Sequence, residues 1–430
     1  MKVLVVGSGG REHALCHALK RTSLRPVELY CAPGSDAIAE IARTIPIAAT
    51  DVPALASLAE KEQIALTIVG GEAPLAAGLA DEFERRGLPV AGPRAEAAQL
   101  ESSKAFAKEF MARHKIPTAR FRVAASASEA REILLGGEFG GEESAVVVKA
   151  DGLAAGKGVV VAETRRDALQ AIAELMEGGR VGSEAARRVV IEEALDGPEA
   201  SLLFWTDGTS YALMPPARDH KRIGEGDTGP NTGGMGAITS ADVLDAETQA
   251  RVVSEIVEPT LAGLRADGME FRGVIFIGLM LTVDGARVLE YNVRFGDPEA
   301  QAILVRLESD LLEIFEAVAH GNLESVRVRW SEEASACVVL AARGYPERPE
   351  TGARIEGLEE AARVSSVQLF HAGTARAADG TWQTAGGRVL GVTSRAPTLA
   401  HALESCYEAV RHIRWDGMQY RRDIGKFSKQ

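Results

Sequence analysis

A glycine-rich turn near residue 150 has the composition of a phosphate-binding loop. Residues 146–149 predict a strand that ends in a lysine, and residues 150–158 (ADGLAAGKG) predict a turn into a second strand. Small residues let a backbone approach phosphate groups closely, and lysines neutralise those groups as mobile point charges. The loop is not a P-loop, because Gly152 and Gly156 are spaced one residue short and Gly158 replaces the hydroxyl residue. Taken alone, an exposed hairpin with two lysines explains the segment equally well.

A carboxylate and an amide stand two residues apart in the segment 288–292 (VLEYN). Side chains alternate across a strand, so Glu290 and Asn292 are expected on one face. Such oxygen donors suit Mg²⁺, which takes one or two protein oxygens and completes its octahedron with water and phosphate oxygens. Arg294 follows and can grip a carboxylate or phosphate through two parallel hydrogen bonds. The structural alternative is a polar cross-strand pair on an exposed face.

Between these segments, residues 189–199 (VVIEEALDGPE) predict a buried strand that runs into an acidic, glycine-containing bend. Backbone N–H and C=O groups at such a bend can read the edge of an adenine, and Glu199 can accept hydrogen bonds from two ribose hydroxyls. Without the other motifs, the same stretch describes a strand end with solvated acids.

Three glycines at the N-terminus, Gly7, Gly9 and Gly10, follow a predicted strand and open a helix, which aims backbone N–H groups at a bound anion. They match the dinucleotide fingerprint G-x-G-x-x-G only in part, because Glu12 stands at its third position. The acidic residue expected about 20 residues later is also missing. An NAD-dependent dehydrogenase therefore remains only as an alternative. A structural turn would explain the glycines but not Arg11 beside them.

The elements around these motifs fall into three blocks. In residues 1–102, short β-branched runs alternate with helical stretches, which predicts βαβ units and a parallel sheet. Residues 103–325 mix helices and strands with long glycine-rich loops, and residues 326–430 predict strands followed by a helix. The strand candidates are 3–6, 66–69, 88–91, 145–150, 188–193, 273–283, 286–292, 336–341 and 387–393, and the helix candidates include 12–21, 52–61 and 399–413.

The composition excludes several classes of protein. With 61 acidic against 48 basic residues, the formal charge of -13 repels phosphate backbones and anionic lipid surfaces. We therefore expect no nucleic acid and no membrane as partners, and the longest apolar run is far below the roughly 20 residues that span a bilayer. The opening MKVLVVGSGG lacks the apolar core and cleavage site of a signal peptide. The four cysteines form no CxxC pair and are expected to be buried thiols of a cytoplasmic protein.

Together these motifs resemble the ATP-grasp superfamily of ligases, and within it most closely the phosphoribosylamine–glycine ligase family. The likeness is carried by ordered segments over nearly the whole chain, namely VLVVGSGGREHAL, AAQLESSKAFAKEFMARHKIPTA, DGLAAGKGV, EEALDGPE, ARDHKRIGEGDTGPNTGGMGA, LEYNVRFGDPE and YRRDIG. It implies a multidomain α/β and α+β fold. An N-terminal parallel-sheet βαβ domain (1–102) would precede a central ATP-grasp domain (103–325), whose glycine-rich lid covers about residues 120–194, and a C-terminal mixed α/β domain (326–430).

The resemblance implies a ligase of purine biosynthesis that joins glycine to 5-phosphoribosylamine and converts ATP to ADP and phosphate. The glycine carboxylate would attack the γ-phosphate to give glycyl phosphate, which the amine then attacks. Lys149, Arg294 and Asp297 would be the catalytic residues, and Glu290 and Asn292 would bind Mg²⁺ or Mn²⁺. A lid that excludes water would protect the acyl phosphate from hydrolysis.

The resemblance also assigns binding residues. Glu192 and Leu195 would meet adenine through the backbone, and Glu199 would bind the ribose. We favour a binding or packing role for His220 over a general base, because an amine nucleophile needs little activation. Many superfamily members carry a further metal carboxylate where this chain has Gly278. The implied ATP contacts are Lys104, Lys149, Gly152, Ala155, Gly156, Lys157, Gly158, Glu192, Glu193, Leu195 and Glu199. The implied phosphoribosylamine contacts are Gly9, Gly10, Arg11, Glu72, Asp219, His220, Lys221, Arg222, Asn231, Thr232 and Gly233.

Other functions remain open at this point. A sibling ATP-grasp carboxylase or ligase would use the same ATP residues with another acceptor, although the DHKR and NTGGMG segments argue against it. A non-catalytic nucleotide-binding or scaffold protein could lose Lys149, Glu290 or Asn292, and all of these are present. With no long exposed apolar stripe, we expect a monomer.

Overall fold

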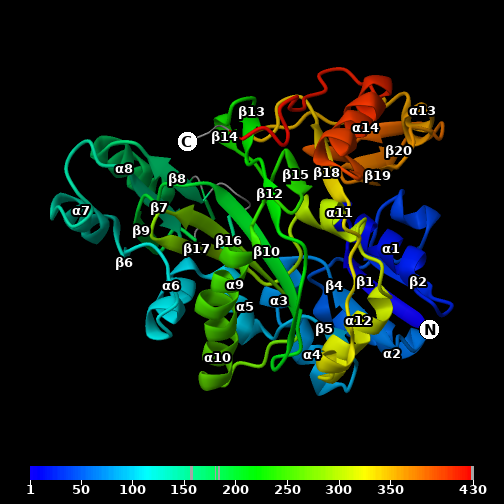
Figure 1. Cartoon of the computed structure of the whole chain (residues 1–430), viewed down its shortest axis with the longest axis horizontal. Coiled ribbons are helices and arrows are strands. Elements are labelled where there is room, and N and C mark those ends of the chain that lie inside the picture. The colour runs from blue at the N-terminus through cyan, green and yellow to red at the C-terminus, as the bar shows by residue number, and fades with distance from the viewer. Residues whose placement is uncertain (155–157, 180, 183–184, 428–430) are drawn as a thin grey trace.

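The computed structural model describes residues 1–154, 158–179, 181–182 and 185–427. In Figure 1 the N-terminal sheet (blue) and the C-terminal elements (orange to red) lie at one end of the molecule, and the segment coloured cyan to teal projects at the other. The green part of the chain lies between them. Three residues of the predicted phosphate loop, Ala155, Gly156 and Lys157, lie outside the described residues.

The N-terminal block forms the predicted parallel sheet. Its five strands follow the order β3-β2-β1-β4-β5, and all the pairs are parallel. Residues 3–6 of β1 are fully buried, because helices cover both faces of the sheet, and this explains the uninterrupted apolar run. The elements are β1 (Lys2–Gly7), α1 (Gly10–Thr22), β2 (Glu28–Pro33), η1 (Ile38–Glu40), β3 (Arg43–Thr44), α2 (Val52–Glu62), β4 (Leu66–Val69), α3 (Glu72–Ala76), α4 (Leu79–Arg85) and β5 (Val90–Ala91).

A nine-stranded sheet forms the centre of the molecule. Its strands follow the order β17-β16-β10-β12-β15-β18-β22-β19, and β11 pairs with the free edge of β10. The strands are β10 (Glu199–Thr206), β11 (Tyr211–Leu213), β12 (Ala217–Asp219), β15 (Gly236–Thr239), β16 (Gly273–Thr282), β17 (Gly285–Asn292), β18 (Ala334–Ala341), β19 (Val367–His371) and β22 (Arg388–Ala396). Because β15 pairs with β18, the sheet continues across the domain boundary proposed after residue 325.

A separate four-stranded antiparallel sheet forms the projecting segment, in the order β6-β9-β7-β8. We call residues 121–193, which contain this sheet, the lid sheet segment. Its strands are β6 (Phe121–Ala124), β7 (Val146–Ala150), β8 (Val159–Ala162) and β9 (Val189–Glu193), and its helices are α7 (Ala127–Leu135), α8 (Arg165–Ile172) and the π-helical turn η2 (Ala173–Glu177). Its buried residues, such as Leu134, Val148 and Ile191, form a hydrophobic cluster of their own.

The remaining elements connect and cover these sheets. The helices are α5 (Ala95–Ser102), α6 (Lys104–Arg113), α9 (Ala246–Val252), η3 (Val253–Val257), α10 (Glu258–Ala266), α11 (Glu299–Leu304), α12 (Leu311–His320), η4 (Leu323–Ser325), α13 (Leu358–Ala362) and α14 (Leu399–His412). The strand pairs are β13 (Arg222–Gly224) with β14 (Thr228–Asn231), and β20 (Thr374–Arg376) with β21 (Trp382–Thr384).

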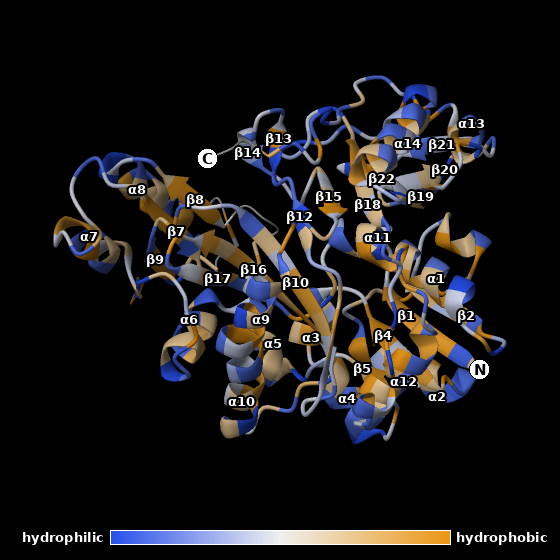
Figure 2. Ribbon diagram, in the orientation of Figure 1, coloured by the Kyte–Doolittle hydropathy of each residue, from blue (hydrophilic) through white to orange (hydrophobic). Residues whose placement is uncertain are grey.

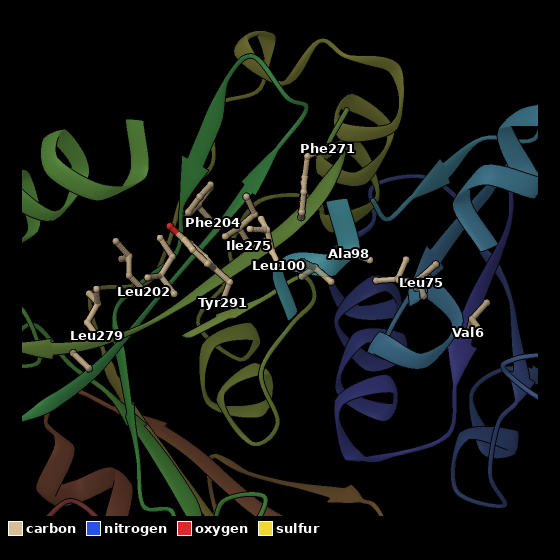
Figure 3. Packing of buried hydrophobic residues seen from close by; sticks show 14 of the residues in the cluster. Val6, Leu75, Ala98, Leu100, Leu202, Phe204, Phe271, Ile275, Leu279 and Tyr291 are labelled. Atoms are coloured by element: carbon tan, nitrogen blue, oxygen red, sulfur yellow. The ribbon is translucent and has the colours of Figure 1, made fainter. Parts of the chain in front are cut away.

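One hydrophobic core joins the N-terminal sheet to the central sheet. Figure 3 shows its path from Val6 and Leu75 through Leu100 to Ile275 and Tyr291. Figure 2 shows hydrophobic residues inside and hydrophilic residues outside: the inner strands β1, β4, β10 and β16 carry much orange, and the outer helices carry blue faces. These two sheets therefore form a common base from which the lid sheet segment projects.

Among the described residues, no helix combines the length and the apolar composition needed to cross a membrane.

Candidate active site

The central sheet gathers the predicted metal ligands on one face. Glu290 of β17 lies opposite Gly278 of β16, and Gly278 lies opposite Ser201 of β10. Directly opposite residues in antiparallel strands point to the same face, and so do residues two apart in one strand. Asn292 therefore lies on the same face as Glu290. A Cβ atom at Gly278 would lie 3.3 Å from Cγ of Glu290, so a carboxylate at that position would stand directly beside it.

Lys149 is fixed at the end of β7 by a carboxylate of the neighbouring strand. Its Nζ lies 2.9 Å from Oε1 of Glu192 and donates a 2.9 Å hydrogen bond to the carbonyl of Leu289. The other oxygen of Glu192 lies 2.7 Å from Nζ of Lys108, which also donates to Thr118. Burial, together with the like charge of Lys149, lowers the pKa of Lys108 to about 8. One carboxylate thus holds two ammonium groups beside β17.

Glu290 lines a small cavity together with Lys104, Lys108 and Lys149. Burial opposes its ionisation, but the positive charges of Lys221, Lys104 and Lys149 outweigh burial and lower the pKa of Glu290. The site therefore holds an ionised carboxylate surrounded by ammonium groups, which is an environment suited to a polyphosphate and its counter-ion.

The donor set of Glu290 and Asn292 fits a hard divalent cation. Asn292 Oδ1 accepts a 3.1 Å hydrogen bond from Arg294, so its orientation is fixed and one lone pair remains. The described residues contain no group of three or more His, Cys, Asp and Glu side chains placed to share a metal ion. An incomplete set of oxygen donors is the arrangement that Mg²⁺ uses where phosphates supply the remaining ligands.

An aspartate ties the lid sheet segment to α6. Oδ1 of Asp151 accepts hydrogen bonds from Oγ of Ser103 at 2.8 Å and from the backbone N–H of Ala105 at 3.1 Å. Its Oδ2 lies 2.5 Å from the guanidinium of Arg188. Gly152 and Leu153 line a cavity at this point together with Ser103 and Asp151, and Gly152 packs closely on one wall, since a Cβ there would lie 2.7 Å from Cβ of Ala185. The other described loop glycine, Gly158, is packed equally closely, since a Cβ there would lie 2.7 Å from Cβ of Ala154.

Arg294 connects the central sheet to the N-terminal domain. Its guanidinium donates to Glu101 at 2.6 Å and to Glu72 at 3.1 Å. Glu101 is 3% exposed and also accepts the backbone N–H of Val293. Burial raises the pKa of Glu72, but Arg294 and Arg11 outweigh burial, and the net shift is downward. Arg294 is therefore held in one orientation by two carboxylates from α5 and α3.

Asp297 lies among three arginines. Its Oδ2 is 3.0 Å from Arg388 of β22, and its Oδ1 accepts from Gln301 at 2.8 Å. Burial opposes ionisation of Asp297, but Arg388 and Arg11 overcome burial and lower its pKa. Arg388 also donates to the carbonyl of Gly233. Charged side chains from all three domains proposed from the sequence thus surround Asp297.

The N-terminal glycine loop is occupied by its own glutamate. Glu12 Oε2 accepts the backbone N–H of Gly9 at 2.6 Å, and Oε1 accepts from Arg11 at 2.7 Å. A Cβ at Gly7 or Gly70 would collide with this side chain. Because the carboxylate already takes the loop amide that a dinucleotide phosphate would use, the geometry disfavours the dehydrogenase alternative.

Acidic side chains at the two ends of the bend after β9 form ion pairs with basic side chains of other segments. Lys221 Nζ lies 2.5 Å from Glu199 Oε2, and Arg120 lies 2.7 Å from Glu193. Asp219 ends β12 and lies near enough to Lys221 to feel its positive charge. Burial raises the pKa of Asp219 to about 6 against the opposing charge of Lys221. Leu195 is half-buried in the bend itself.

His220 points to the opposite side from Asp219 and Lys221. Its ring is 1% exposed, stacks on Phe427 at 4.4 Å, and accepts the backbone N–H of Gly425 through Nε2 at 2.9 Å. Burial, together with the charge of Arg421, lowers the pKa of His220 to about 4. The structure thus places the predicted substrate residue His220 within the packing of the C-terminal segment.

The rest of the predicted acceptor segment forms a hairpin and a turn. Arg222 of β13 pairs with Asn231 of β14. Thr232 donates to the carbonyl of Lys221 and accepts from Gly234. Gly233 donates its N–H to the hydroxyl of Tyr345 at 2.9 Å. Gly10 of the N-terminal domain lies close to Gln301 and Ala372.

Four charged residues at this site are missing from the predictions made on the sequence. They are Glu101, Lys108, Glu299 and Arg388. Each is at most half-exposed and acts on a predicted residue across a long stretch of chain. Glu101 and Lys108 lie in the ESSKAFAK segment used for the resemblance, and Glu299 ends the NVRFGDPE segment, so the motif offered a signal for these three. Arg388 belongs to no segment that was singled out.

Three family models match consecutive parts of the chain. The phosphoribosylglycinamide synthetase N domain matches residues 1–101, its ATP-grasp (A) domain matches 102–300, and its C domain matches 335–427.

Among curated proteins, the chain is 48% identical to a phosphoribosylamine–glycine ligase of Xylella fastidiosa, over 99% of this chain and 97% of the relative. It is also 48% identical to that of Chlorobaculum tepidum, over 99% of each. Among solved structures, it resembles a phosphoribosylamine–glycine ligase of Thermotoga maritima with a TM-score of 0.83 and 33% identity, covering 98% of this chain and 100% of the other. A biotin carboxylase domain of Hydrogenobacter thermophilus has a TM-score of 0.72 at 15% identity, over 98% and 92% of the two chains, which is a likeness of fold alone.

Proposed function

The chain belongs to the phosphoribosylglycinamide synthetase family, and from this we infer that it is an ATP-dependent carbon–nitrogen ligase that joins glycine to 5-phosphoribosylamine. The product is glycinamide ribonucleotide, and the reaction belongs to purine biosynthesis. The fold expectation of a parallel-sheet domain, an ATP-grasp domain and a C-terminal domain is confirmed.

The reaction has two group transfers. An oxygen of the glycine carboxylate attacks the γ-phosphorus of ATP, the bond from that phosphorus to the bridging oxygen breaks, and ADP leaves. The amine nitrogen of phosphoribosylamine then attacks the carbonyl carbon of glycyl phosphate, phosphate leaves, and the nitrogen loses a proton. Both steps move charge on phosphoryl oxygens, so catalysis rests on positioning and on fixed positive groups.

The observation that supports the site assignment best is the cavity at β17, which Lys104, Lys149 and Glu290 line together. In the proposal, Lys104 and Lys149 contact the phosphates of ATP, and Gly152 with the following loop covers them. Glu192 holds Lys149 through its side chain, so it has a role beyond the backbone contact with adenine expected from the sequence. The bend at Glu193–Glu199 adjoins the adenosine.

Glu290 and Asn292 are the proposed ligands of Mg²⁺ or Mn²⁺. When bound, such an ion supplies charge neutralisation to the phosphate oxygens of ATP. Arg294 orients the carboxylate of glycine or its acyl phosphate, and Glu101 and Glu72 fix its direction.

The phosphoribosylamine lies in the proposal between Arg11 with the Gly9–Gly10 turn, Asp297, and the segment around Asn231–Gly233. Arg388 supports this arrangement because it joins Asp297 to Gly233 from the C-terminal block. Arg11, Arg388 and Arg294 give the site the positive charge that a sugar phosphate requires, although the whole chain is acidic.

The test is ADP and phosphate formation from ATP, Mg²⁺ and glycine, with phosphoribosylamine generated from ribose 5-phosphate and ammonia. Strict dependence on both glycine and the amine is the expected result. If ATP is hydrolysed at the same rate without glycine, the protein is instead a related ATP-grasp enzyme with another substrate, such as a carboxylase. We further propose that the protein acts as a cytoplasmic monomer, and the four buried, unpaired cysteine thiols are consistent with a reducing compartment. Sedimentation of the purified chain tests the monomer.

A further inference from the structure

The hairpin of β13 and β14 carries two of the residues assigned to phosphoribosylamine but has little packing of its own. Arg222 begins this hairpin, and Asn231 pairs with it at the other end. Residues 222–231 are all half-buried or exposed. A segment with few buried apolar contacts opens easily unless polar contacts hold it. The conformation of the hairpin must therefore be fixed by hydrogen bonds and ion pairs.

The end of the chain supplies such contacts. Residues 420–427, which we call the C-terminal segment, lie beside β13 and β14, where Figure 1 shows the red part of the chain. Asp423 accepts the backbone N–H of Gly226 at 2.8 Å, and Arg422 donates its backbone N–H to Glu225 at 3.2 Å. The partners in each of these bonds are 197 residues apart in the sequence. Only the folded chain brings them together.

Arg421 is at the centre of this contact and is fully buried. Its Nε and Nη2 donate to the two oxygens of Asp423 at 2.8 Å and 2.7 Å. Its Nη1 donates to Oδ1 of Asp227 at 2.6 Å and to the carbonyl of Arg222 at 3.1 Å. One guanidinium therefore connects the C-terminal segment both to the first strand of the hairpin and to its turn.

Asp227 occupies a backbone conformation that needs such a restraint. Its φ is +55°, and the preceding residue, Gly226, has φ +67°. A left-handed conformation is open to glycine but costs energy for a residue with a Cβ atom, although Asp tolerates it better than most. Such a residue keeps this conformation where its surroundings fix it. The ion pair with Arg421 supplies that restraint, so its loss would let the turn relax.

The C-terminal segment also contacts the chain just before and just after the hairpin. Before it, the ring of His220 stacks on Phe427 and accepts the backbone N–H of Gly425. After it, Ile424 packs against Gly236, where a Cβ would lie 2.8 Å from Cδ1 of Ile424. The segment thus holds both ends of the stretch 220–236 as well as the turn in its middle.

We propose that Arg421 is a positioning residue for phosphoribosylamine, which aligns Arg222 and Asn231 through the turn of the hairpin without touching the substrate. This rests on the ligase function and on the location of phosphoribosylamine proposed above. Groups that are already oriented bind a ligand more tightly, because ordering them on binding costs free energy. Loosening the hairpin should therefore weaken the binding of one substrate and leave the other two unaffected.

The experiment replaces Asp227 by Asn and Arg421 by Gln, singly and together, and measures steady-state kinetics for each substrate. In each single variant the KM for phosphoribosylamine should rise about 5- to 30-fold, while kcat and the KM values for ATP and glycine change less than about threefold. Because both residues act through one contact, the double variant should be at most about twofold worse than the poorer single variant. Arg421→Lys, which keeps the charge, should recover part of the loss.

Asp416→Asn is the matched control, because Asp416 forms an ion pair of the same kind with Arg343 at 2.7 Å, outside both the hairpin and the C-terminal segment. If Arg421→Gln does not fold, Asp227→Asn tests the contact alone, since the side chain of Asp227 is exposed. An unchanged KM for phosphoribosylamine, or equal losses for all three substrates, overturns the proposal. Additive losses in the double variant would also overturn it, because Asp227 would then act on the substrate without Arg421. A wild-type enzyme that hydrolyses ATP at the same rate without glycine would instead overturn the proposed function itself.

Discussion

At the scale of single residues, each charge in this site is held by another. Arg294 reaches its position because Glu101 and Glu72 bind different nitrogens of one guanidinium. Lys149 is held because Glu192 is itself shared with Lys108. Such pairs make the charge distribution rigid before substrates arrive, and preorganised charge is what phosphoryl transfer uses.

Replacing Arg294 by Lys should lower kcat for ADP formation by about 10- to 100-fold, because one ammonium cannot serve both carboxylates and a substrate oxygen. Steady-state assays at saturating glycine measure this. The control is Arg251→Lys, an exposed arginine on α9 whose ion pair among the described residues is with Glu255. Near-normal turnover of Arg294→Lys would remove the proposed role.

Replacing Glu192 by Gln should destabilise the protein, since two buried ammonium groups then lose the carboxylate that pairs with both of them. A loss of about 3 to 5 kcal/mol is expected for removing one partner of a buried ion pair. Urea unfolding gives the stability, and the KM for ATP should rise in parallel. A variant as stable as the wild type would mean that Lys108, whose pKa is already lowered to about 8, gives up its proton easily.

The sequence identifies the residues that sit within one local motif. Lys149, Glu290 and Asn292 could be singled out because a strand's alternation or a glycine turn placed them. Arg388 could not, because its partner Asp297 is 91 residues away and only the tertiary fold brings them together. Glu299 lies in the NVRFGDPE motif, but the sequence indicates no role for it, because its burial and its proximity to Asp219 arise only in the folded chain.

At the scale of elements, the bend between β9 and β10 is fixed by one glycine. Gly197 has φ +144°, and a Cβ there would overlap the carbonyl oxygen of Leu281. The next residue, Pro198, accepts the N–H of Leu281 at 3.0 Å, so the bend rests directly on the end of β16. This contact couples the lid sheet segment to the central sheet.

Gly197→Ala should therefore reduce stability by roughly 1 to 3 kcal/mol through backbone strain and raise the KM for ATP. Thermal unfolding and ATP titration measure the two effects. Gly141→Ala, in the lid sheet segment, is the control, since a Cβ there meets no atom within 4 Å. Equal behaviour of the two variants would contradict a special role for the bend.

Elements with a clear period were predictable, whereas the start of β10 was not. The runs 3–6, 146–150 and 286–292 fall in strands, as their apolar or alternating patterns indicate. The strand β10 begins at Glu199, inside the segment that the sequence indicates as an acidic bend. The acidic motif recognised in the sequence ends at Glu199. In the folded chain a strand begins at that residue, because residues 199–206 pair with β16.

At the scale of the whole molecule, two histidines join the N-terminal domain to the C-terminal block. His13 of α1 accepts the backbone N–H of His371 through Nδ1 at 3.0 Å, and His371 contacts Thr374 at 2.9 Å. Burial, then the like charges of His371 and His17, lower the pKa of His13 to about 3. Burial also lowers the pKa of His371 to about 4. The interface therefore favours the neutral form of both imidazole rings.

Stability should therefore fall in mild acid. Because both folded pKa values lie below the ordinary value of about 6.5, the unfolded chain binds more protons between these limits. The stabilisation is complete above about pH 6.5 and is lost as the pH falls toward 4, by an amount on the order of 3 kcal/mol for His371 alone. Urea midpoints at pH 7.5 and pH 5 measure the change.

The double variant His13→Gln with His371→Gln should show a smaller drop in the urea midpoint between these pH values. The matched control is His320→Gln with His412→Gln, two exposed histidines at helix ends. If the control variant reduces the drop in the urea midpoint as much as the variant of the buried pair does, the two interface histidines do not cause the pH dependence of stability.

The sheet that runs from β17 to β19 also limits how this protein can be divided. A chain ending near residue 325 would leave β15 with an open row of N–H and C=O groups where β18 now pairs. Exposed edges of that kind recruit strands from other molecules, so such a fragment is prone to aggregation. The family models separate a C domain from the ATP-grasp domain. A protein divided at that boundary would nevertheless need another strand to pair with β15 in place of β18.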